Sequence, residues 1–202
     1  MALEDVEITP CDEAPSAALQ AFLDDADARL DTLIADGLTA RLPNFAPAEF
    51  HVVHATLAVL ADGPAGGECF LEWGSALGGI TGIAAALGFR ASGIEIDDEM
   101  VTLSRALLAA HGLRAEIAQG SFVPDEHEIP PEFEDPETAT LQTGMAAYDL
   151  LERDLDEFAV VYAYPWPDME DAFLDLFDTY ASPGALFVTY HGQDGCRVRK
   201  KV

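Results

Sequence analysis

Two stretches in the N-terminal third of the chain place apolar residues on one face of an α-helix. In the first, Ser16 precedes the apolar series and Gly37 follows it, as expected at the two ends of a helix. Its apolar positions are Leu19, Phe22, Leu23, Ala26, Leu30, Leu33 and Ile34. A second series runs over 50–60. We therefore predict an N-terminal helical cap over residues 1–66.

From residue 67 the pattern changes to short apolar runs that alternate with helical windows. The apolar runs, which are typical of strands, are 68–73, 91–96, 114–118, 158–164 and 185–190. The helical windows are 79–87, 98–111 and 168–180. Strands that alternate with helices favour a parallel sheet covered on both faces, and strands buried on both faces are apolar throughout. Residues 67–202 are thus predicted to form an α/β core.

Residues 123–140 interrupt this alternation with seven acids, four prolines and no base. Such a composition predicts a long exposed acidic loop after the third strand. A helix is expected to resume over 141–155. Only ten residues follow Gly192, which leaves room for one short strand but not for a closing hairpin. We therefore expect an abbreviated sheet edge.

The chain has 37 acids and 10 bases, a formal net charge of −27. Nucleic acids and anionic membranes are bound through clusters of Lys and Arg, so neither is an expected partner. The N-terminal residues lack the apolar core of a signal peptide, and no apolar run is long enough to span a membrane. Three cysteines without a CxxC pair are typical of free thiols in a reducing cytoplasm, where we expect the protein. Nothing in the sequence fixes its oligomeric state.

The segment CFLEWGSALGG, residues 69–79, leads from a predicted strand through small residues into a predicted helix. Small residues allow a ligand to approach the backbone, and the start of a helix offers free N–H groups to its polar atoms. Glu95 stands 21 residues after Gly74, at the end of the next strand. An acid there is placed to accept both ribose hydroxyl groups of an adenine nucleoside. The pair predicts a site for a nucleotide or nucleoside cofactor.

Three features distinguish among such cofactors. Glu72 precedes the turn, where a carboxylate is unfavourable beside a pyrophosphate and favourable near an ammonium or sulfonium group. No lysine occurs before Lys200, which excludes a P-loop and the Tyr-x-x-x-Lys pair of reductases. The fourth strand ends in YAYPWP and not in residues typical of hydride transfer. The sequence therefore favours S-adenosylmethionine, and an NAD-dependent oxidoreductase is the weaker alternative.

With these motifs, the chain from about residue 43 to residue 192 resembles the class I S-adenosylmethionine-dependent methyltransferase family. The family's glycine motif, Asp/Glu-x-Gly-x-Gly-x-Gly, is matched by Glu72, Gly74 and Gly78, with Ala76 in place of the middle glycine. The resemblance implies a Rossmann-like methyltransferase fold, S-adenosylmethionine as the cofactor, and ribose binding by the acid at position 95.

The family's third-strand motif often reads Gly-Asp-Phe, with the acid in contact with adenine. Here the segment is Gly120-Ser121-Phe122, so Ser121 or a backbone group would take over that contact. The cofactor-binding residues predicted in this way are Glu72, Gly74, Ser75, Ala76, Gly78, Glu95, Ile96, Ser121, Phe122 and Tyr162. A looser similarity, in NFAPAEFHVVHATLAVL and AVVYAYPWPDMEDAF, is to the lysine-methylating branch of the family and does not transfer its substrate.

Tyr164 and Trp166 follow the fourth strand, at the sheet edge where open α/β sheets bind ligands. We predict that they face the substrate as catalytic residues, because an aromatic rim suits a cationic methyl donor. The family's Asn/Asp-Pro-Pro-aromatic motif for amino groups on bases is not matched, since Tyr164 replaces its first polar residue. We therefore expect a protein side chain or a small molecule as the methyl acceptor.

Several other residues have both a structural and a functional interpretation. His191, after the fifth strand, would be a base near the substrate or a packed histidine. Phe45 to Phe50 would close over the cofactor or pack the second helix. His51 and His54 lack the Cys or acid partners of a metal site, so no metal is expected. The unmatched acceptor motif and the short C-terminus keep open a second function, a non-catalytic S-adenosylmethionine or nucleoside-binding module.

Overall fold

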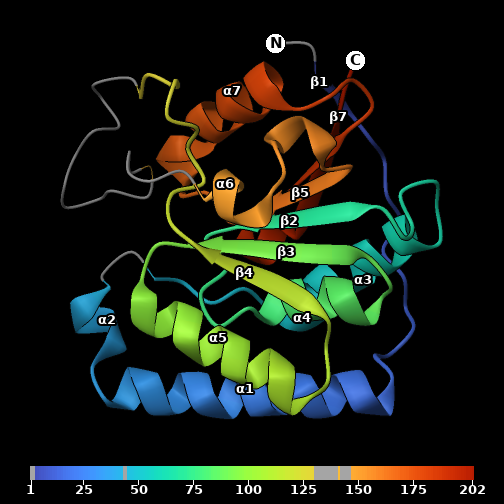
Figure 1. The fold of residues 1–202 in the computed structure, drawn as a ribbon. Helices are drawn as coiled ribbons and strands as arrows, with labels where there is room; N and C mark the ends of the chain where they lie inside the picture. The colour runs from blue at the N-terminus through green and yellow to red at the C-terminus, as the bar shows by residue number, and fades with distance from the viewer. Residues whose placement is uncertain (1–2, 43–44, 130–140, 142–146) are drawn as a thin grey trace.

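A seven-stranded sheet with helices on both faces forms the centre of the computed structural model, which describes residues 3–42, 45–129, 141 and 147–202 (Figure 1). The strands are β1 (Leu3–Asp5), β2 (Cys69–Trp73), β3 (Arg90–Glu95), β4 (Ala115–Gln119), β5 (Val160–Ala163), β6 (Leu186–Tyr190) and β7 (Cys196–Lys201). The helices are α1 (Ala17–Ala35), α2 (Leu38–Arg41), α3 (Phe50–Ala61), α4 (Gly79–Ala86), α5 (Asp98–Ala110), α6 (Tyr148–Leu151) and α7 (Glu170–Tyr180). Short 3-10 turns cover Leu155–Glu157, Pro167–Met169 and Gly192–Asp194.

The strands of the sheet follow the order β1-β7-β6-β5-β2-β3-β4. The strands from β2 to β6 run parallel, whereas β7 is antiparallel to β6 and β1 is antiparallel to β7. The order reverses at β2, because β3 and β4 lie on one side of it and β5 and β6 on the other. Ligands of open α/β sheets bind outside the carboxyl ends of the strands at such a point. The topology therefore predicts where a site would lie.

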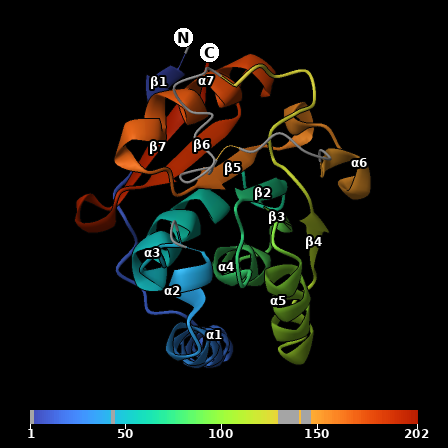
Figure 2. The same ribbon diagram turned by 90° about the vertical axis from the view of Figure 1, so that its left-hand side faces the viewer.

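Helices cover both faces of the sheet (Figures 1 and 2). α6 and α7 lie on one face, and α3, α4 and α5 lie on the other, with α1 beyond them as an outer layer. Each face has its own apolar core: Phe70 and Ile83 belong to the core on the α1 side, and Leu71 and Phe177 to the core on the α7 side. Neighbouring residues of β2 thus enter opposite cores, which is why the strand is apolar throughout.

The predicted α/β class is confirmed, and so are the five predicted strands and three predicted helices of the core, with ends shifted by one or two residues. The two predicted N-terminal helices are α1 and α3. Ser16 starts α1, where its hydroxyl accepts the N–H of Leu19 at 3.2 Å, and Gly37 follows the end of α1 with a φ of 94°. Within the described residues, no helix is both long and apolar enough to cross a membrane.

The expectation of an abbreviated sheet edge is wrong. The C-terminal strand β7 pairs with β6, and the N-terminal strand β1 adds a further strand outside β7. Asp5 of β1 stands opposite Arg199 of β7, with 3.3 Å between Asp5 Oδ1 and Arg199 Nε, and the strands β1 and β7 lie side by side (Figure 1). Residues 1–66 therefore contribute a strand as well as helices, and the division at residue 66 stays a prediction. The three-residue strand has no alternating apolar pattern that could have predicted it.

The helix expected over 141–155 is confirmed at α6 and is wrong over 152–155. Residues 142–146 lie outside the described part of the chain, and beyond them only α6 is an α-helix. The chain leaves α6 at Glu152, which has a φ of 51° and so cannot continue a right-handed helix. Asp154 then caps the 3-10 turn Leu155–Glu157.

The acidic segment 123–140 is exposed only in part of its described portion. Asp125, Glu126 and Glu128 are exposed, as expected, but the apolar residues Val123 and Ile129 are buried in the core on the α7 side. Because these two side chains are buried, the start of this segment packs against the core on the α7 side. Residues 130–140 lie outside the described residues.

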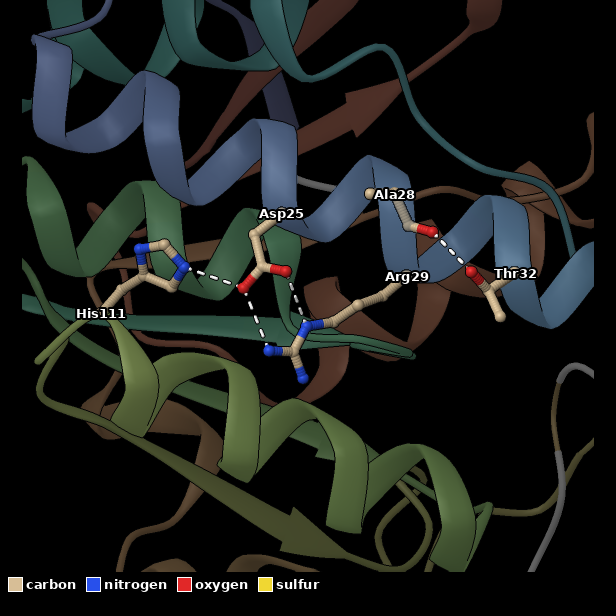
Figure 3. Close-up of polar contacts among 5 residues, drawn as sticks. All are labelled: Asp25, Ala28, Arg29, Thr32 and His111. Carbon is tan, nitrogen blue, oxygen red and sulfur yellow. Dashed lines mark hydrogen bonds and ion pairs between the residues drawn. The ribbon is translucent and has the colours of Figure 1, made fainter.

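An acid near the middle of α1 ties that helix to the end of α5 (Figure 3). The carboxylate of Asp25 accepts hydrogen bonds from Arg29 Nε and Nη2, both at 3.0 Å, and lies 2.9 Å from His111 Nε2. The hydrogen bonds with Arg29 and then His111 hold the pKa of Asp25 down at about 2. Asp25 therefore stays charged in neutral solution, and the tie persists until the pH falls toward that value.

A glycine of α4 makes room for a large side chain of α1. A Cβ atom on Gly82 would lie 2.2 Å from Phe22 Cζ, closer than packed atoms approach. Overpacking of this kind costs about 1–3 kcal/mol, which exceeds the gain of about 1 kcal/mol in helix propensity. Gly82→Ala should therefore lower the free energy of unfolding, measured by urea denaturation. In a Phe22→Leu background the same substitution should be neutral or stabilising, and equal costs in both backgrounds would contradict this packing.

Candidate functional site

A cavity of about 780 Å³ opens at the carboxyl ends of β2, β3 and β5, where the strand order reverses. Its size is that of sites for small molecules and cofactors. The turn after β2 and the residues after β3 and β5 form one wall. Residues of α1, the segment 45–50 that leads into α3, the residues after β4, the start of α7 and the turn between β6 and β7 also line it.

Nine of the ten predicted cofactor-binding residues line this cavity. They are Glu72, Gly74, Ser75, Ala76, Glu95, Ile96, Ser121, Phe122 and Tyr162. The tenth, Gly78, is not a lining residue: a Cβ atom there would lie 3.2 Å from Ser104 Cβ of α5, so its small size serves the packing of α4 on α5. Tyr164 and Trp166, predicted to face the substrate, also line the cavity. The structure thus brings the predicted residues together, and their binding roles stay predictions.

Glu72 is almost completely buried at the end of β2, with 4% of its surface exposed. Its Oε2 accepts hydrogen bonds from the N–H group and the hydroxyl group of Thr81, at 2.7 and 2.5 Å, and so caps the first turn of α4. Burial raises the pKa of Glu72 to about 8, against the opposite effect of these two bonds. The carboxyl group is therefore mostly protonated at pH 7, and a cation in the cavity would favour its charged form.

Glu95 joins the ends of two adjacent strands. Its Oε2 accepts the N–H of Ala76, at 2.7 Å, in the turn after β2. Its Oε1 accepts the N–H groups of Ile96 and Asp97, at 2.8 and 2.9 Å, after β3. Burial raises the pKa of Glu95, and the three N–H groups act in the opposite direction. The same carboxylate therefore shapes the turn and lines the cavity.

The end of the cavity beside β5 and β6 is aromatic and charged. Tyr164 packs edge to face on Tyr190, with ring centroids 4.8 Å apart, and Trp166 is 40% exposed. Glu170, at the start of α7, and Arg197 of β7 line this end but had no predicted role. Because β7 was not expected to form a full strand, nothing in the sequence placed the arginine next to the site.

The segment 45–50 contacts both the cavity and α4. Phe45, Ala48 and Phe50 line the cavity. The ring of Phe50 also packs against Gly79 of α4, where a Cβ atom would lie only 2.4 Å from Phe50 Cε1. Packing of α3 through Phe50 is therefore confirmed. Closure of this segment over a cofactor stays a prediction.

Three solved structures with a similar fold are those of methyltransferases. The chain is similar to an RNA methyltransferase from Salinibacter ruber in complex with S-adenosyl-L-homocysteine, with a TM-score of 0.51 and 23% identity, covering 76% of this chain and 91% of that one. It is also similar to an O-methyltransferase from Bacillus cereus in complex with SAH, with a TM-score of 0.53 and 15% identity, covering 87% of this chain and 66% of that one. A third similar structure is the SAH-bound methyltransferase PaMTH1 from Podospora anserina, with a TM-score of 0.54 and 11% identity, covering 88% of this chain and 63% of that one. This chain has the Rossmann-like methyltransferase fold.

The likeness to these methyltransferases is one of structure. The chain spans 66% and 63% of the lengths of the second and third proteins, and its sequence matches no family model and no curated protein. At such identities the methyltransferase fold is shared, and the activity has to be argued from the residues of the cavity.

Potential metal ligands lie elsewhere on this methyltransferase fold. In the described part of the chain, the side chains of Asp154, Asp156 and Glu157 form the one group whose oxygens are close enough to share an ion, and all three are exposed. None of them lines the cavity. His54 is buried on α3, where burial lowers its pKa, and it belongs to no such group with His51. Nothing in this arrangement assigns a metal to the site.

The raised pKa of Glu72 has a consequence for stability. Between about pH 4.5 and 8 the folded state holds a proton on Glu72 that the unfolded chain has released, so stability falls as the pH rises. Glu72→Gln should make this fall less steep by about 1 kcal/mol per pH unit, measured by urea unfolding at several values from pH 5 to 8. Glu68→Gln, at an exposed acid just before β2, is the matched control and should leave the slope unchanged. Equal slopes in wild type and Glu72→Gln would contradict the burial argument.

Ala76 holds a backbone conformation that favours glycine. Its φ is 45°, in the left-handed region, where an alanine costs about 1–2 kcal/mol. Ala76→Gly should therefore raise the free energy of unfolding by about 0.5–1 kcal/mol, after the entropy of the more flexible unfolded chain is subtracted. Ala106→Gly on the exposed face of α5 should instead cost about 1 kcal/mol. A loss of stability at both positions would show that Ala76 is not strained.

Proposed function

We propose that this protein is a methyltransferase that transfers a methyl group from S-adenosylmethionine to a protein side chain or a small molecule. The observation that carries the proposal is the cavity at the strand reversal, which combines two buried acids, Glu72 and Glu95, with the small-residue turn between them. Adenosine, an amino acid and a sulfonium ion are the parts of this donor. Proteins of the same fold have been solved with S-adenosyl-L-homocysteine, the product that the donor leaves.

The polar groups of the cavity fit such a donor. The hydroxyl groups of Ser75 and Tyr162 are buried and have no hydrogen-bond partner among the described residues, which is unusual unless a ligand supplies one. Glu95 keeps acceptor capacity for a ribose hydroxyl group, because a carboxylate has about four lone-pair sites and three are in use. Glu72 would favour the ammonium group of the amino acid. Ile96, which is partly exposed, offers an apolar surface to adenine.

The donor supplies a methyl carbon that its positive sulfur has already activated. The protein's part is to align an acceptor with that carbon and to exclude water. Tyr164 and Trp166 line the cavity just after β5, and their ring faces suit a cationic sulfur. The net charge of −27 speaks against RNA, the acceptor in the name of the Salinibacter ruber protein, because a phosphate backbone would be repelled.

The two alternative functions share parts of this site. A non-catalytic S-adenosylmethionine-binding module would use the same cavity, but the argument from an incomplete sheet no longer supports it, because β7 and β1 complete the edge. An NAD-dependent oxidoreductase would place a pyrophosphate beside the turn, next to Glu72, where burial already disfavours negative charge.

A comparison of ligands tests the proposed donor. Thermal-shift and calorimetric titrations should show binding of S-adenosylmethionine and S-adenosyl-L-homocysteine and no binding of NAD. Glu95→Ala should weaken S-adenosyl-L-homocysteine binding by about tenfold or more, which is about 1.4 kcal/mol. Asp98→Ala, at an exposed acid in the first turn of α5, is the control and should leave the affinity unchanged. Binding of NAD alone would overturn the proposal.

Methyl transfer separates the enzyme from the binding module. Labelled S-adenosylmethionine should pass its methyl group to a component of a lysate from the source organism when the protein is added. We expect the label in the protein or the small-molecule fraction and not in the nucleic acids. Binding of the donor with no label in any fraction would favour the module.

Glu72 gives donor binding a proton signature. If the ammonium group of S-adenosyl-L-homocysteine lies beside Glu72, the pKa of Glu72, about 8 without a ligand, should fall. The Glu72 carboxyl group should then release its proton when the ligand binds. Calorimetry at pH 6.5, in two buffers of different ionisation enthalpy, should show release of about one proton per ligand. The Glu72→Gln variant should release none, and neither should binding of 5′-methylthioadenosine, which lacks the amino acid. Equal release with both ligands would exclude Glu72 from the ammonium site.

A further inference from the structure

A polar wall at the β6–β7 end of the cavity is not needed to hold the donor. His191 follows β6, Arg197 belongs to β7, and Glu170 is the first residue of α7. All three line the cavity together with Tyr164. The two parallel strands β5 and β6 and the antiparallel strand β7 therefore bring charged groups to the end where an acceptor would enter.

The imidazole of His191 has one nitrogen in contact with the protein and one without a partner. Nε2 lies 2.8 Å from Thr189 Oγ1 and 3.8 Å from Glu170 Oε1. A carboxylate near Nε2 favours a proton on that nitrogen; in that tautomer Nε2 donates to the threonine oxygen and Nδ1 keeps a free lone pair. Within the described residues, no group forms a hydrogen bond with Nδ1. The ring is thus held at one nitrogen and open at the other.

Glu170 is itself held in place by two arginines of β7. Arg199 Nη2 lies 2.9 Å from Oε1, and Arg197 Nη1 lies 3.6 Å from Oε2. Arg199 is also paired with Asp5 of the N-terminal strand. The Arg199–Glu170 pair is largely shielded from water, with 17% and 20% of the two side chains exposed, so it fixes the carboxylate against the histidine better than an exposed pair would.

Burial keeps the ring of His191 neutral at pH 7, and the charged groups around it act in both directions. Burial lowers its pKa most. Glu170 of α7 and Asp194 of the turn before β7 act to raise the pKa of His191, and Arg197 and Arg199 act to lower it. The balance is a lowered pKa, which leaves the ring free to accept a proton in neutral solution.

We propose that His191 is the general base of the acceptor site, taking a proton on Nδ1 from an O–H or N–H nucleophile as this nucleophile is methylated, with Glu170 as its positioning residue. The proposal rests on the proposed methyltransferase function. The acceptor's lone pair forms the new bond to the methyl carbon, and the carbon–sulfur bond breaks with its electron pair on sulfur. The acceptor's proton goes to Nδ1 and from there to water.

Other groups at this end are less suited to the role. Arg197 keeps its proton at all ordinary pH values and cannot act as a base. The carboxylate of Glu170 is already engaged in ion pairs with Arg199 and Arg197, and Asp194 is exposed to water. A base is needed only for an acceptor that carries a proton in neutral solution. The acceptor is therefore a hydroxyl or amine compound and not a carboxylate.

Methyl-transfer rates test the base directly. The donor is labelled S-adenosylmethionine, and the acceptors are the protein and small-molecule fractions of a lysate from the source organism. His191→Asn should lower the initial rate at pH 7.5 by about 10²–10⁴-fold, with S-adenosyl-L-homocysteine affinity within about threefold of wild type. Its remaining rate should rise with pH and with added imidazole. His127→Asn, on the α7 side and outside the cavity, is the matched control and should leave the rate unchanged.

Glu170→Gln distinguishes positioning from plain packing. The rate of the wild type should fall at acidic pH as His191 becomes protonated. Because the Glu170 carboxylate acts to raise the pKa of His191, its removal should move this fall to lower pH. A role in packing alone would lower the rate at every pH without moving the fall, and that result would overturn the positioning of His191 by Glu170.

The protonation state of His191 gives a readout that needs no acceptor. Nitrogen-15 NMR of the histidine side chains, in the complex with S-adenosyl-L-homocysteine at pH 7.5, should show a neutral ring with its proton on Nε2. A proton on Nδ1 would overturn the proposal, even if His191→Asn fails to fold. Product formation by His191→Asn at a rate within about threefold of wild type would overturn it as well. No S-adenosyl-L-homocysteine binding by the wild type would instead overturn the proposed function, and the base with it.

Discussion

The carboxylate of Glu95 is the interaction on which the rest of the site depends. It accepts three backbone N–H groups, one in the turn after β2 and two in the loop after β3. Without it these groups would be left unpaired in the cavity wall, at about 1–3 kcal/mol for each that stays buried. The glycine turn and the end of β3 are therefore held at a fixed distance before any ligand arrives, and the group that holds them is also one that a ligand would contact.

The two acids of the cavity, Glu72 and Glu95, differ in the groups that donate hydrogen bonds to them. Glu95 is bonded to backbone N–H groups, whereas Glu72 is bonded to Thr81 and otherwise buried, and its pKa rises to about 8. A buried carboxyl group that is neutral when alone and charged beside a cation discriminates between ligands by their charge. This difference favours a donor with an ammonium group over one with a pyrophosphate, and it does so without a lysine or arginine at the turn.

The antiparallel end of the sheet serves a different purpose from the parallel part. The parallel strands β2, β3 and β5 end at the acids and the glycine turn, while β6 and β7 carry His191, Arg197 and Arg199 toward Glu170. Asp5 of β1 pairs with Arg199, which in turn pairs with Glu170, so the first described residues of the chain are linked to this end of the cavity. In the function we propose, donor and acceptor chemistry are divided between the two halves of one sheet.

The sequence by itself determined the parallel strands, the helices that follow them, and the positions of Glu72, Glu95 and Tyr164 around one cavity. These features follow from local patterns: apolar runs, small residues in a turn, and acids at strand ends. Only the tertiary structure decided that Gly78 packs against α5, that Leu3–Asp5 form β1, and that Glu170 faces His191. Each of these depends on contacts between residues far apart in the chain, and no local pattern encodes such a contact.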